Sequence, residues 1–405
     1  MTPPATTSSI SPAPAPAVKH GVRPRCLVVC FNRLVPANQG NSRRIMQLVR
    51  FYKSRGFEVD LLYHNEEGFD VGLSDSLARE FGRVTVIKSS SRKLILPGHV
   101  CRIMDWYDSQ LDAACRDMHR LRGYTLVHAN YVWYSPLFDQ FGPEVLKVLD
   151  LHDMFGERRA KYIAAGMKPQ WFSTTYEEED AAIRKVDVAL AIQKEEATAF
   201  AARGHRNILY LPYVEPCVRE FVPTTVARPL TFGYLGSGND WNVLSMNDLL
   251  QQLEANPGSF DHPLIVAGGV TKHVREFPSA IKIGFVQELH TFYDAIDVAI
   301  NPMVGGTGLK IKTVEPLSYG CPVLTSRPGV EGVGHLWQLP IFEDNVEFAE
   351  YLIERFTPKN ATETLNVLLD QARRTREMLD DEYALQTGRF ITWLDARLGA
   401  ATRAA

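Results

Sequence analysis

The sequence has little of several features that would mark special classes of protein. Its 405 residues contain only six cysteines, and these are scattered, so neither a disulfide framework nor a zinc site is expected. The formal net charge of −3 gives no global electrostatic reason to expect nucleic-acid binding. No run of about 18 uninterrupted apolar residues occurs, so we expect no membrane span. These absences make a cytoplasmic globular protein the default expectation.

What the sequence does contain is a repeated alternation of short apolar runs and amphipathic stretches. Residues 1–22 are rich in Pro, Ala, Ser and Thr and are interpreted as a disordered leader. The alternation predicts two doubly wound α/β domains with parallel sheets, at 23–215 and 216–375, and a helical segment at 376–405 that packs back toward the first domain. The predicted strands lie within 26–31, 57–64, 84–88, 124–130, 144–152, 186–193, 207–214, 229–238, 263–269, 281–286, 297–302 and 322–326.

The most informative stretch is GGTGLKIKTVEPLSYGCPVLTS at residues 305–326. It predicts a glycine loop beyond a strand and a helix from about 309 to 319, whose first N–H groups carry the positive end of the helix dipole. Lys310 and Lys312 add two charges, which suits a diphosphate. Glu315 lies on the same face as Lys312 and can accept two hydrogen bonds from a ribose diol. A solvated helix with an ion pair explains the same residues, because the loop is neither a Walker loop nor a GxGxxG fingerprint.

The same stretch resembles the donor-binding segment of GT-B fold glycosyltransferases, especially retaining enzymes of glycosyltransferase family 4. The pattern is a Gly-rich loop, K-x-K-x-x-E, a G-x-P-V segment and a Gly-(x)-Glu-Gly loop, and here it reads GTGLKIKTVEPLSYGCPVLTSRPGVEGV. Weaker similarity extends through GYLGSGNDWN, GFVQELHTFYDAIDVAINP, QGNSRRIMQLVRFYKSRG, LVHAN and VLDLHD. The resemblance implies the GT-B fold, with two Rossmann-like domains facing each other across a cleft, and a UDP- or GDP-linked sugar as donor.

The resemblance also implies roles for individual residues. Glu315 would bind the nucleotide ribose, the two lysines would lie near the diphosphate, and Val286 would offer backbone contacts to the base. The expected donor site comprises Gly40, Arg43, Gly236, Val286, Thr307, Gly308, Lys310, Lys312 and Glu315. No metal or cofactor is expected, because the helix start and the lysines supply the positive charge that Mg²⁺ would supply and no Asp-x-Asp occurs in a suitable loop.

Two positions and one loop depart from the pattern of the family. Thr307 stands eight positions before Glu315, where many members have a glutamate that contacts the transferred sugar. The loop SGNDWN lacks the basic pair that often follows the glycine loop of the second domain. Pro316 stands where the family usually has alanine, and proline inside a helix removes a hydrogen bond. The identity of the sugar therefore stays open.

The first half supplies candidates for the acceptor side. His128 in LVHAN and His152 in LDLHD stand at predicted strand ends, where they could reach a ligand or could simply satisfy backbone carbonyl groups. Asp150, Asp153 and Arg158 form a polar cluster in the same region. We expect His128, Asn130, Asp153 and Arg158 to bind the acceptor, and we place His152 with Lys310 and Glu315 as candidate catalytic residues.

Residues 83–102 contain five Lys or Arg and no acid, with Leu94, Ile95 and Leu96 between turn residues. Such a segment suits peripheral contact with an anionic membrane at the inner face, and a solvated loop over a packed strand is the alternative.

The expected function is transfer of a sugar to a hydroxyl of a glycan or lipid-linked saccharide in cell-surface polysaccharide or glycoconjugate synthesis. The alternatives are a nucleotide-sugar epimerase or hydrolase on the same fold, and a degenerate GT-B domain that only binds.

Overall fold

A computed structural model describes residues 23–37, 39–66, 71–90, 100–169, 171–256, 258–306 and 308–404. The predicted leader at 1–22, the apolar tip at 94–96 and Thr307 lie outside these residues. The chain divides into two compact units. The first is formed by the described parts of Met1–Ser91, Asp108–Asn130 and Leu137–Val148, and the second by those of Arg92–Tyr107, Tyr131–Pro136 and Leu149–Ala405.

The first half of the chain forms a seven-stranded sheet in the order β3-β2-β1-β4-β5-β6-β7. Its strands are β1 (Arg25–Cys30), β2 (Glu58–Asn65), β3 (Val84–Lys88), β4 (Leu126–Asn130), β5 (Leu146–Asp150), β6 (Val188–Ala191) and β7 (Ile208–Tyr210). The pairs of β1 with β2 and β4, of β2 with β3 and of β6 with β7 are parallel. The middle strands β1 and β4 are buried except for Arg25 at the start of β1, as expected where both faces of a parallel sheet are covered.

Helices connect these strands. They are α1 (Gly40–Ser54), α2 (Val71–Glu80), α3 (Ile103–Trp106), α4 (Gln110–Arg122), α5 (Arg158–Ala164), α6 (Tyr176–Ile183) and α7 (Lys194–Ala202), with a 3-10 helix, η1 (Val132–Gln140). The strand and helix alternation predicted for this half is confirmed. The observed strands are shorter than the predicted ranges at several ends, because the terminal residues join the loops beyond the ladder.

The second half forms a six-stranded sheet in the order β10-β9-β8-β11-β12-β13, and all its pairs are parallel. Its strands are β8 (Phe232–Leu235), β9 (Leu264–Ala267), β10 (Ala280–Gly284), β11 (Val298–Asn301), β12 (Val323–Ser326) and β13 (Ile341–Phe342). The chain leaves β8 toward one edge and later returns to add β11 on its other side. The strand order therefore reverses between β8 and β11, the place where doubly wound sheets bind ligands.

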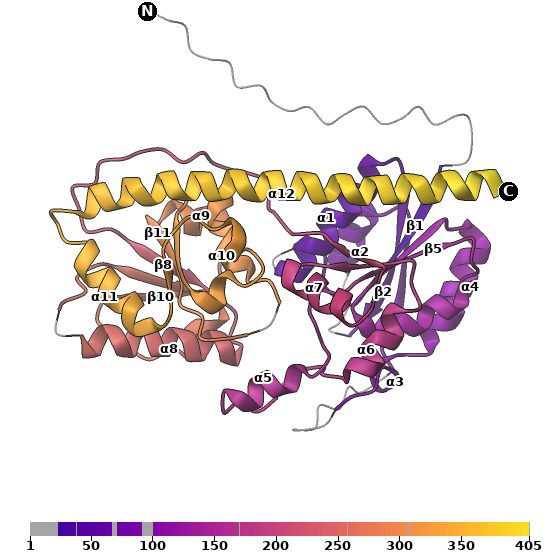
Figure 1. Cartoon of the computed structure of the whole chain (residues 1–405), viewed down its shortest axis with the longest axis horizontal. Coiled ribbons are helices and arrows are strands. Elements are labelled where there is room, and N and C mark those ends of the chain that lie inside the picture. The colour runs from indigo at the N-terminus through magenta and orange to yellow at the C-terminus, as the bar shows by residue number, and fades with distance from the viewer. Residues whose placement is uncertain are drawn as a thin grey trace, which may run out of the picture. The chain divides into compact units, whose positions relative to one another are not determined.

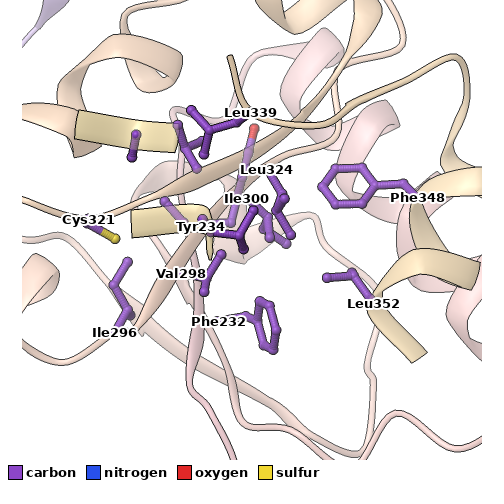
Figure 2. Packing of buried hydrophobic residues seen from close by; sticks show 14 of the residues in the cluster. Phe232, Tyr234, Ile296, Val298, Ile300, Cys321, Leu324, Leu339, Phe348 and Leu352 are labelled. Carbon is purple, nitrogen blue, oxygen red and sulfur yellow. The ribbon is translucent and has the colours of Figure 1, made fainter. Parts of the chain in front are cut away.

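Helices lie on both sides of this second sheet, with α8 (Asp240–Ala255) and α11 (Asn345–Arg355) on one side and α9 (Leu289–Asp294), α10 (Ile311–Ser318) and α12 (Ala361–Ala404) on the other (Figure 1). Three 3-10 turns, η2 (Gly269–Lys272), η3 (Arg327–Val330) and η4 (Gly334–Leu336), complete this half. Figure 2 shows the core beside α11, where Phe232 of β8, Val298 of β11 and Leu324 of β12 face Phe348 and Leu352 of α11. This packing sets the positions of the loops that leave β8 and β11.

The long C-terminal helix α12 packs on the second sheet's own elements. Arg376 of α12 donates to Ser318 Oγ at the end of α10 (2.9 Å), and Thr375 Oγ1 accepts from the N–H of Gln338 (3.0 Å). The helix passes through residues 375 and 376 without a break, so the predicted boundary there does not coincide with the end of an element. The predicted domain limits and the return of 376–405 toward the first domain stay predictions.

Candidate functional site

The two glycine-containing loops predicted for the donor site follow the two strands at which the order of the second sheet reverses. Gly236 comes directly after β8, and its N–H donates to the carbonyl of Ala267 (3.0 Å) at the end of β9. A Cβ on Gly268 would lie 2.3 Å from the carbonyl oxygen of Gly236, so only glycine permits this approach. The second loop follows β11 and leads into α10.

Glycines shape the loop between β11 and α10. Gly306 (φ 127°) and Gly308 (φ 67°) both have left-handed backbone torsions, which side-chain-bearing residues rarely adopt. A Cβ on Gly308 would lie 3.4 Å from the carbonyl oxygen of His152 and 3.6 Å from Cγ of Asp153. The glycine loop and the loop that follows β5 are therefore neighbours, and both belong to the second compact unit.

Lys310 is the residue immediately before α10, and it is buried (5% exposed). Its ammonium lies 2.5 Å from Oε2 of Glu331, whose side chain is about half exposed (46%). Glu331 belongs to the GVEG sequence that follows β12, so its position was visible in the quoted motif, but its pairing with Lys310 was not. The charge of Lys310 is thus compensated from the solvent side.

Lys312, in the first turn of α10, has different surroundings. Its Nζ donates to Tyr234 Oη (3.2 Å) and to Asn242 Oδ1, and it lies 3.5 Å from the sulfur of Met303. It also lies 5.3 Å from the centre of the Tyr234 ring. Burial, together with the nearby charge of Lys310, lowers the pKa of Lys312 to about 7. The lysine therefore carries a readily titratable charge beside the loop that follows β8.

Glu315 lies one turn further along α10 and is also buried (5% exposed). Its Oε1 accepts a hydrogen bond of 2.5 Å from the hydroxyl of Tyr293 in α9. The ring of Tyr293 stacks on Tyr319, with centroids 4.5 Å apart. Sequence reasoning did not find Tyr293, because nothing in the pattern of α9 distinguishes a core tyrosine from one that orients a carboxylate. Pro316 lies inside α10, and the helix spans eight residues, from Ile311 to Ser318.

The predicted polar cluster after β5 is present. Asp153 lies 3.2 Å from Nε of Arg158 and accepts the N–H of Met154 (2.9 Å). His152 has a left-handed backbone (φ 61°), its Nε2 is 3.4 Å from Oδ2 of Asp150, and its ring stacks on Tyr131. A non-glycine residue with this torsion is uncommon and is held here by its surroundings. The catalytic role of His152 stays a prediction.

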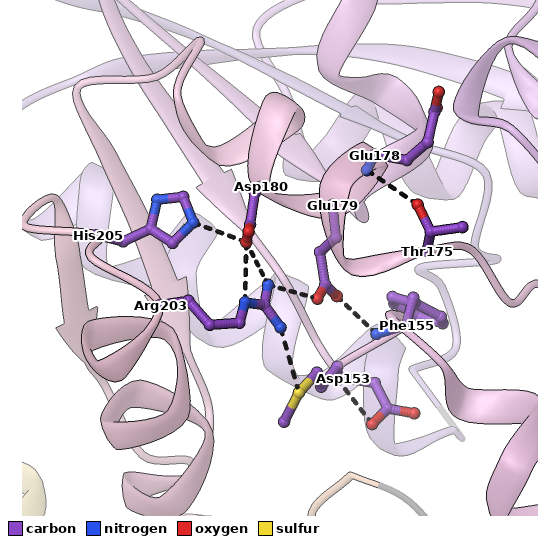
Figure 3. Close-up of polar contacts among 9 residues, drawn as sticks. Asp153, Phe155, Thr175, Glu178, Glu179, Asp180, Arg203 and His205 are labelled. Atoms are coloured by element: carbon purple, nitrogen blue, oxygen red, sulfur yellow. Dashed lines mark hydrogen bonds and ion pairs between the residues drawn. The ribbon is translucent and has the colours of Figure 1, made fainter.

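An ionic network supports the same loop from behind (Figure 3). Glu179 of α6 is buried and accepts the N–H of Phe155 (2.6 Å), while its other oxygen accepts from Arg203 (2.9 Å). Asp180 binds Arg203 (2.5 Å) and His205 (2.7 Å). Burial raises the pKa of Asp180, but the bonds from His205 and Arg203 outweigh burial and leave it lowered. Every charge in this network has an opposite charge as partner.

Two residues of the first unit that were expected to bind the acceptor lie inside a strand. His128 and Asn130 lie in β4 and are almost fully buried (1% and 0% exposed). A ring nitrogen of His128 lies 2.9 Å from the hydroxyl of Tyr52, and Asn130 donates to the carbonyl of Val29 (3.0 Å). The alternative considered for His128 was a bond to a backbone carbonyl group, whereas this contact is with a tyrosine hydroxyl. Acceptor binding by His128 and Asn130 stays a prediction.

The remaining predicted donor residues occupy loop positions. Gly40 begins α1, and Nε of Arg43 donates to the carbonyl of Ala37 (3.1 Å). Val286 follows β10 and packs on the core of the second sheet. Their proposed contacts with a nucleotide stay predictions, as does that of Thr307.

Comparison with known proteins decides the class of the protein. Residues 229–358 match the family model described as Glycosyl transferases group 1. These residues run from the approach to β8 to the end of α11, and they include the whole of the glycine loop and α10. This chain is a glycosyltransferase with the GT-B fold. The fold class and the family resemblance inferred from the sequence are thereby confirmed.

The GT-B glycosyltransferase also resembles individual proteins. An uncharacterized 44.6 kDa protein in the cps region of Klebsiella pneumoniae is 23% identical over 360 residues, which cover 81% of this chain and 90% of that protein. Sucrose-phosphate synthase from Thermosynechococcus elongatus has a similar structure (TM-score 0.63, 17% identity, 92% of this chain and 100% of that one). So does HepE from Anabaena in complex with UDP (TM-score 0.63, 13% identity, 93% and 100%). At these identities the structural likeness shows the fold alone.

Two further observations concern membrane-spanning helices and metal-binding groups in the glycosyltransferase. Across the described residues, no helix combines the length and the hydrophobicity that crossing a membrane requires. Within the same part of the chain, no group of three or more His, Cys, Asp or Glu side chains is arranged to hold a metal ion.

Proposed function

We propose that this glycosyltransferase moves a sugar from a UDP- or GDP-linked donor to a hydroxyl group of a glycan or lipid-linked saccharide. The observation that carries the proposal is the arrangement at the start of α10. A glycine loop at the switch point of the sheet leads into a helix with Lys310 at its start and Lys312 in its first turn, and with Glu315 one turn further along. A nucleotide offers a diphosphate for the positive groups and a ribose diol for the carboxylate.

The donor side is built from charge and hydrogen bonding. The first N–H groups of α10 and the ammonium of Lys310 would receive the diphosphate, because an anion at a helix start is stabilised by the dipole and by unpaired N–H donors. Glu315 is held by Tyr293, which orients its carboxylate for the ribose hydroxyls. Lys312, whose pKa is lowered, would gain its full charge when an anion binds near it.

The reaction breaks the bond between the anomeric carbon and the diphosphate oxygen and forms a bond from that carbon to the acceptor oxygen. Negative charge grows on the leaving diphosphate, and the helix start and Lys310 stabilise it in the transition state. The proton of the acceptor hydroxyl would pass to the leaving phosphate, so no side chain is assigned as base. Retention of configuration and independence from metal follow the family resemblance and belong to this proposal.

The setting that we propose is synthesis of a cell-surface polysaccharide or glycoconjugate. The relative from Klebsiella pneumoniae is named for the cps region, and the structures of HepE and of TarM from S. aureus contain UDP, the latter with alpha-GlcNAc-glycerol. A cytoplasmic location and peripheral contact with an anionic membrane through residues 83–102 are further parts of the proposal. Residues 91–99 of that segment lie outside the described part of the chain.

Thermal shift with UDP, GDP and their common sugar conjugates tests the donor site. We expect one nucleotide to stabilise the wild type, by about 2.7 kcal/mol at a hundredfold excess over its dissociation constant. Glu315→Ala should lose this stabilisation, because it removes the ribose acceptor. Tyr293→Phe and the exposed Glu350→Ala should retain most of it.

The results of this titration distinguish a donor site at α10 from the alternatives. If no nucleotide stabilises the wild type, the donor-site proposal fails and a degenerate domain becomes the better explanation. If Glu315→Ala binds as well as the wild type, the nucleotide binds elsewhere.

A further inference from the structure

Two buried polar side chains at the start of α7 each have one polar atom without a hydrogen-bond partner among the described residues. Gln193, the residue before the helix, is 6% exposed, and Glu196 in its first turn is 4% exposed. Within the described part of the chain, Nε2 of Gln193 and Oε2 of Glu196 make no hydrogen bond. The Gln193 side chain does not cap the helix either. A buried polar atom without a partner costs stability, so the fold alone gives no reason for this pair.

Their surroundings connect them to the donor site. A Cβ on Gly332, which follows Glu331, would lie 2.7 Å from Cγ of Gln193, so the GVEG loop packs directly on this side chain. Glu196 interacts electrostatically with Lys310 and with Asp153. Asp153 in turn lies beside Gly308. All of these residues belong to the second compact unit.

Glu196 therefore interacts with groups assigned to the two substrates, and Gln193, one turn before it, contacts the loop that carries Glu331. Lys310 is proposed for the donor diphosphate and Asp153 for the acceptor. The group that travels from one to the other is the transferred sugar, which is attached to the diphosphate and must meet the acceptor hydroxyl. Side chains near both Lys310 and Asp153 are in reach of that sugar.

We infer that Gln193 and Glu196 bind hydroxyl groups of the transferred sugar and thereby contribute to the choice of sugar. The inference rests on the proposed function, since it presumes a nucleotide-sugar donor. It also gives a reason for the departure at Thr307, because this chain would supply its sugar-binding carboxyl from α7 instead of from the loop before α10.

The chemistry of the two groups suits sugar hydroxyls. A carboxamide offers both a donor and an acceptor, and so does a neutral carboxyl group. Burial, with the negative charges of Asp153 and Glu179 next, raises the pKa of Glu196 well above its usual value, which favours the neutral form. A hydroxyl also donates and accepts, so each side chain can make complementary bonds to a sugar without introducing a full negative charge beside the diphosphate.

The test compares a sugar nucleotide with its bare nucleotide. UDP, GDP, UDP-glucose, UDP-galactose, UDP-N-acetylglucosamine and GDP-mannose are titrated into the wild type and into Glu196→Leu, Gln193→Leu and Glu196→Gln. Affinity for the preferred sugar nucleotide should fall about tenfold in each leucine variant, while affinity for the bare nucleotide stays within about twofold. Glu196→Gln should keep part of the sugar contribution, because it keeps hydrogen-bonding groups.

The apo proteins provide a second, independent readout. Glu196→Leu should melt at a higher temperature than the wild type, because it removes an unpartnered buried carboxyl group. The matched control is Glu195→Leu on the exposed side of the same turn, which should change neither binding nor the ratio of the two affinities.

Several results would overturn the inference. Equal loss of bare nucleotide and sugar nucleotide would show a structural role, as would a lower melting temperature of Glu196→Leu. An unchanged ratio of affinities would show that the pair does not touch the donor sugar, and a raised acceptor KM alone would place it on the acceptor. If the wild type binds no nucleotide at all, the proposed function itself fails, and this inference fails with it.

Discussion

Two groups of titratable side chains in the second unit differ in how they are paired. In the network of Glu179, Asp180, Arg203 and His205, each charged group faces an opposite one within 2.9 Å. Around α10 and α7, by contrast, Lys312 has only neutral partners and an oxygen of Glu196 has none among the described residues. Removing these groups from water costs free energy in both places, and in the first group the ion pairs with Arg203 offset part of that cost.

The difference in pairing indicates that the two groups have different roles. The fully paired network holds the loop from Asp153 to Phe155 in place, so it contributes to the structure of this loop. Lys312 lies beside the switch point of the second sheet, and Glu196 interacts electrostatically with Lys310 at the same place; the ligand that we propose there would complete the bonding of both. Incomplete hydrogen bonding lowers the free energy of unfolding there, as is usual for polar groups at a functional site.

The largest expected effect is in the paired network. Arg203→Met should destabilise the protein by about 3–5 kcal/mol, because it leaves buried Glu179 without its cation. Urea denaturation measures the change, with exposed Arg206→Met as control. A loss below about 1 kcal/mol would mean that the network is not structural and would remove the contrast with α10.

An intermediate effect is expected at Lys312. The folded protein holds this amine at a pKa of about 7, below the ordinary 10.5, so the folded state binds fewer protons than the unfolded state between these values. The stability of the wild type relative to Lys312→Met should therefore rise with pH, by at most ~1.4 kcal/mol per pH unit, between about 7 and 10. Denaturation of both proteins at pH 7, 8 and 9 measures this. A difference that does not vary with pH would show that the amine is already charged and well solvated.

The smallest expected effect is at Glu331. Its pair with Lys310 is open to solvent on the glutamate side, so Glu331→Gln should cost less than about 1 kcal/mol of stability. The same change should strengthen nucleotide binding severalfold, because Lys310 can then bind the diphosphate without first breaking its ion pair with Glu331. Calorimetric titration with UDP and GDP measures it. Weaker binding would instead show that Glu331 orients Lys310 for the ligand.

The sequence predicted those features that depend on local pattern. The apolar runs predicted the two parallel sheets, and the glycines, Lys310, Lys312 and Glu315 lie at a strand end and helix start as expected. The partners of these residues come from distant segments, such as Tyr293 in α9 and Glu331 after β12, and short-range spacing does not report such contacts.

The positions that the sequence did not predict have physical reasons as well. LVHAN and LDLHD look alike in sequence, but His128 lies inside β4 and bonds to Tyr52, whereas His152 lies beyond β5 in a left-handed turn. Where a strand ends relative to such a motif depends on pairing with its neighbours. Gln193 and Glu196 were missed because QKEE reads as an ordinary polar helix start, and only the fold shows that two of its side chains are buried.

The most direct test of the central claim is calorimetric titration of UDP and GDP into the wild type and Lys310→Met, with exposed Lys194→Met as control. The account predicts one site per chain for one nucleotide, with affinity reduced about 10- to 100-fold in Lys310→Met, as expected when a charged hydrogen-bond donor to the diphosphate is lost, and unchanged in the control. Equal affinity in Lys310→Met and the wild type would contradict it, because the start of α10 would then not be the site that receives the diphosphate.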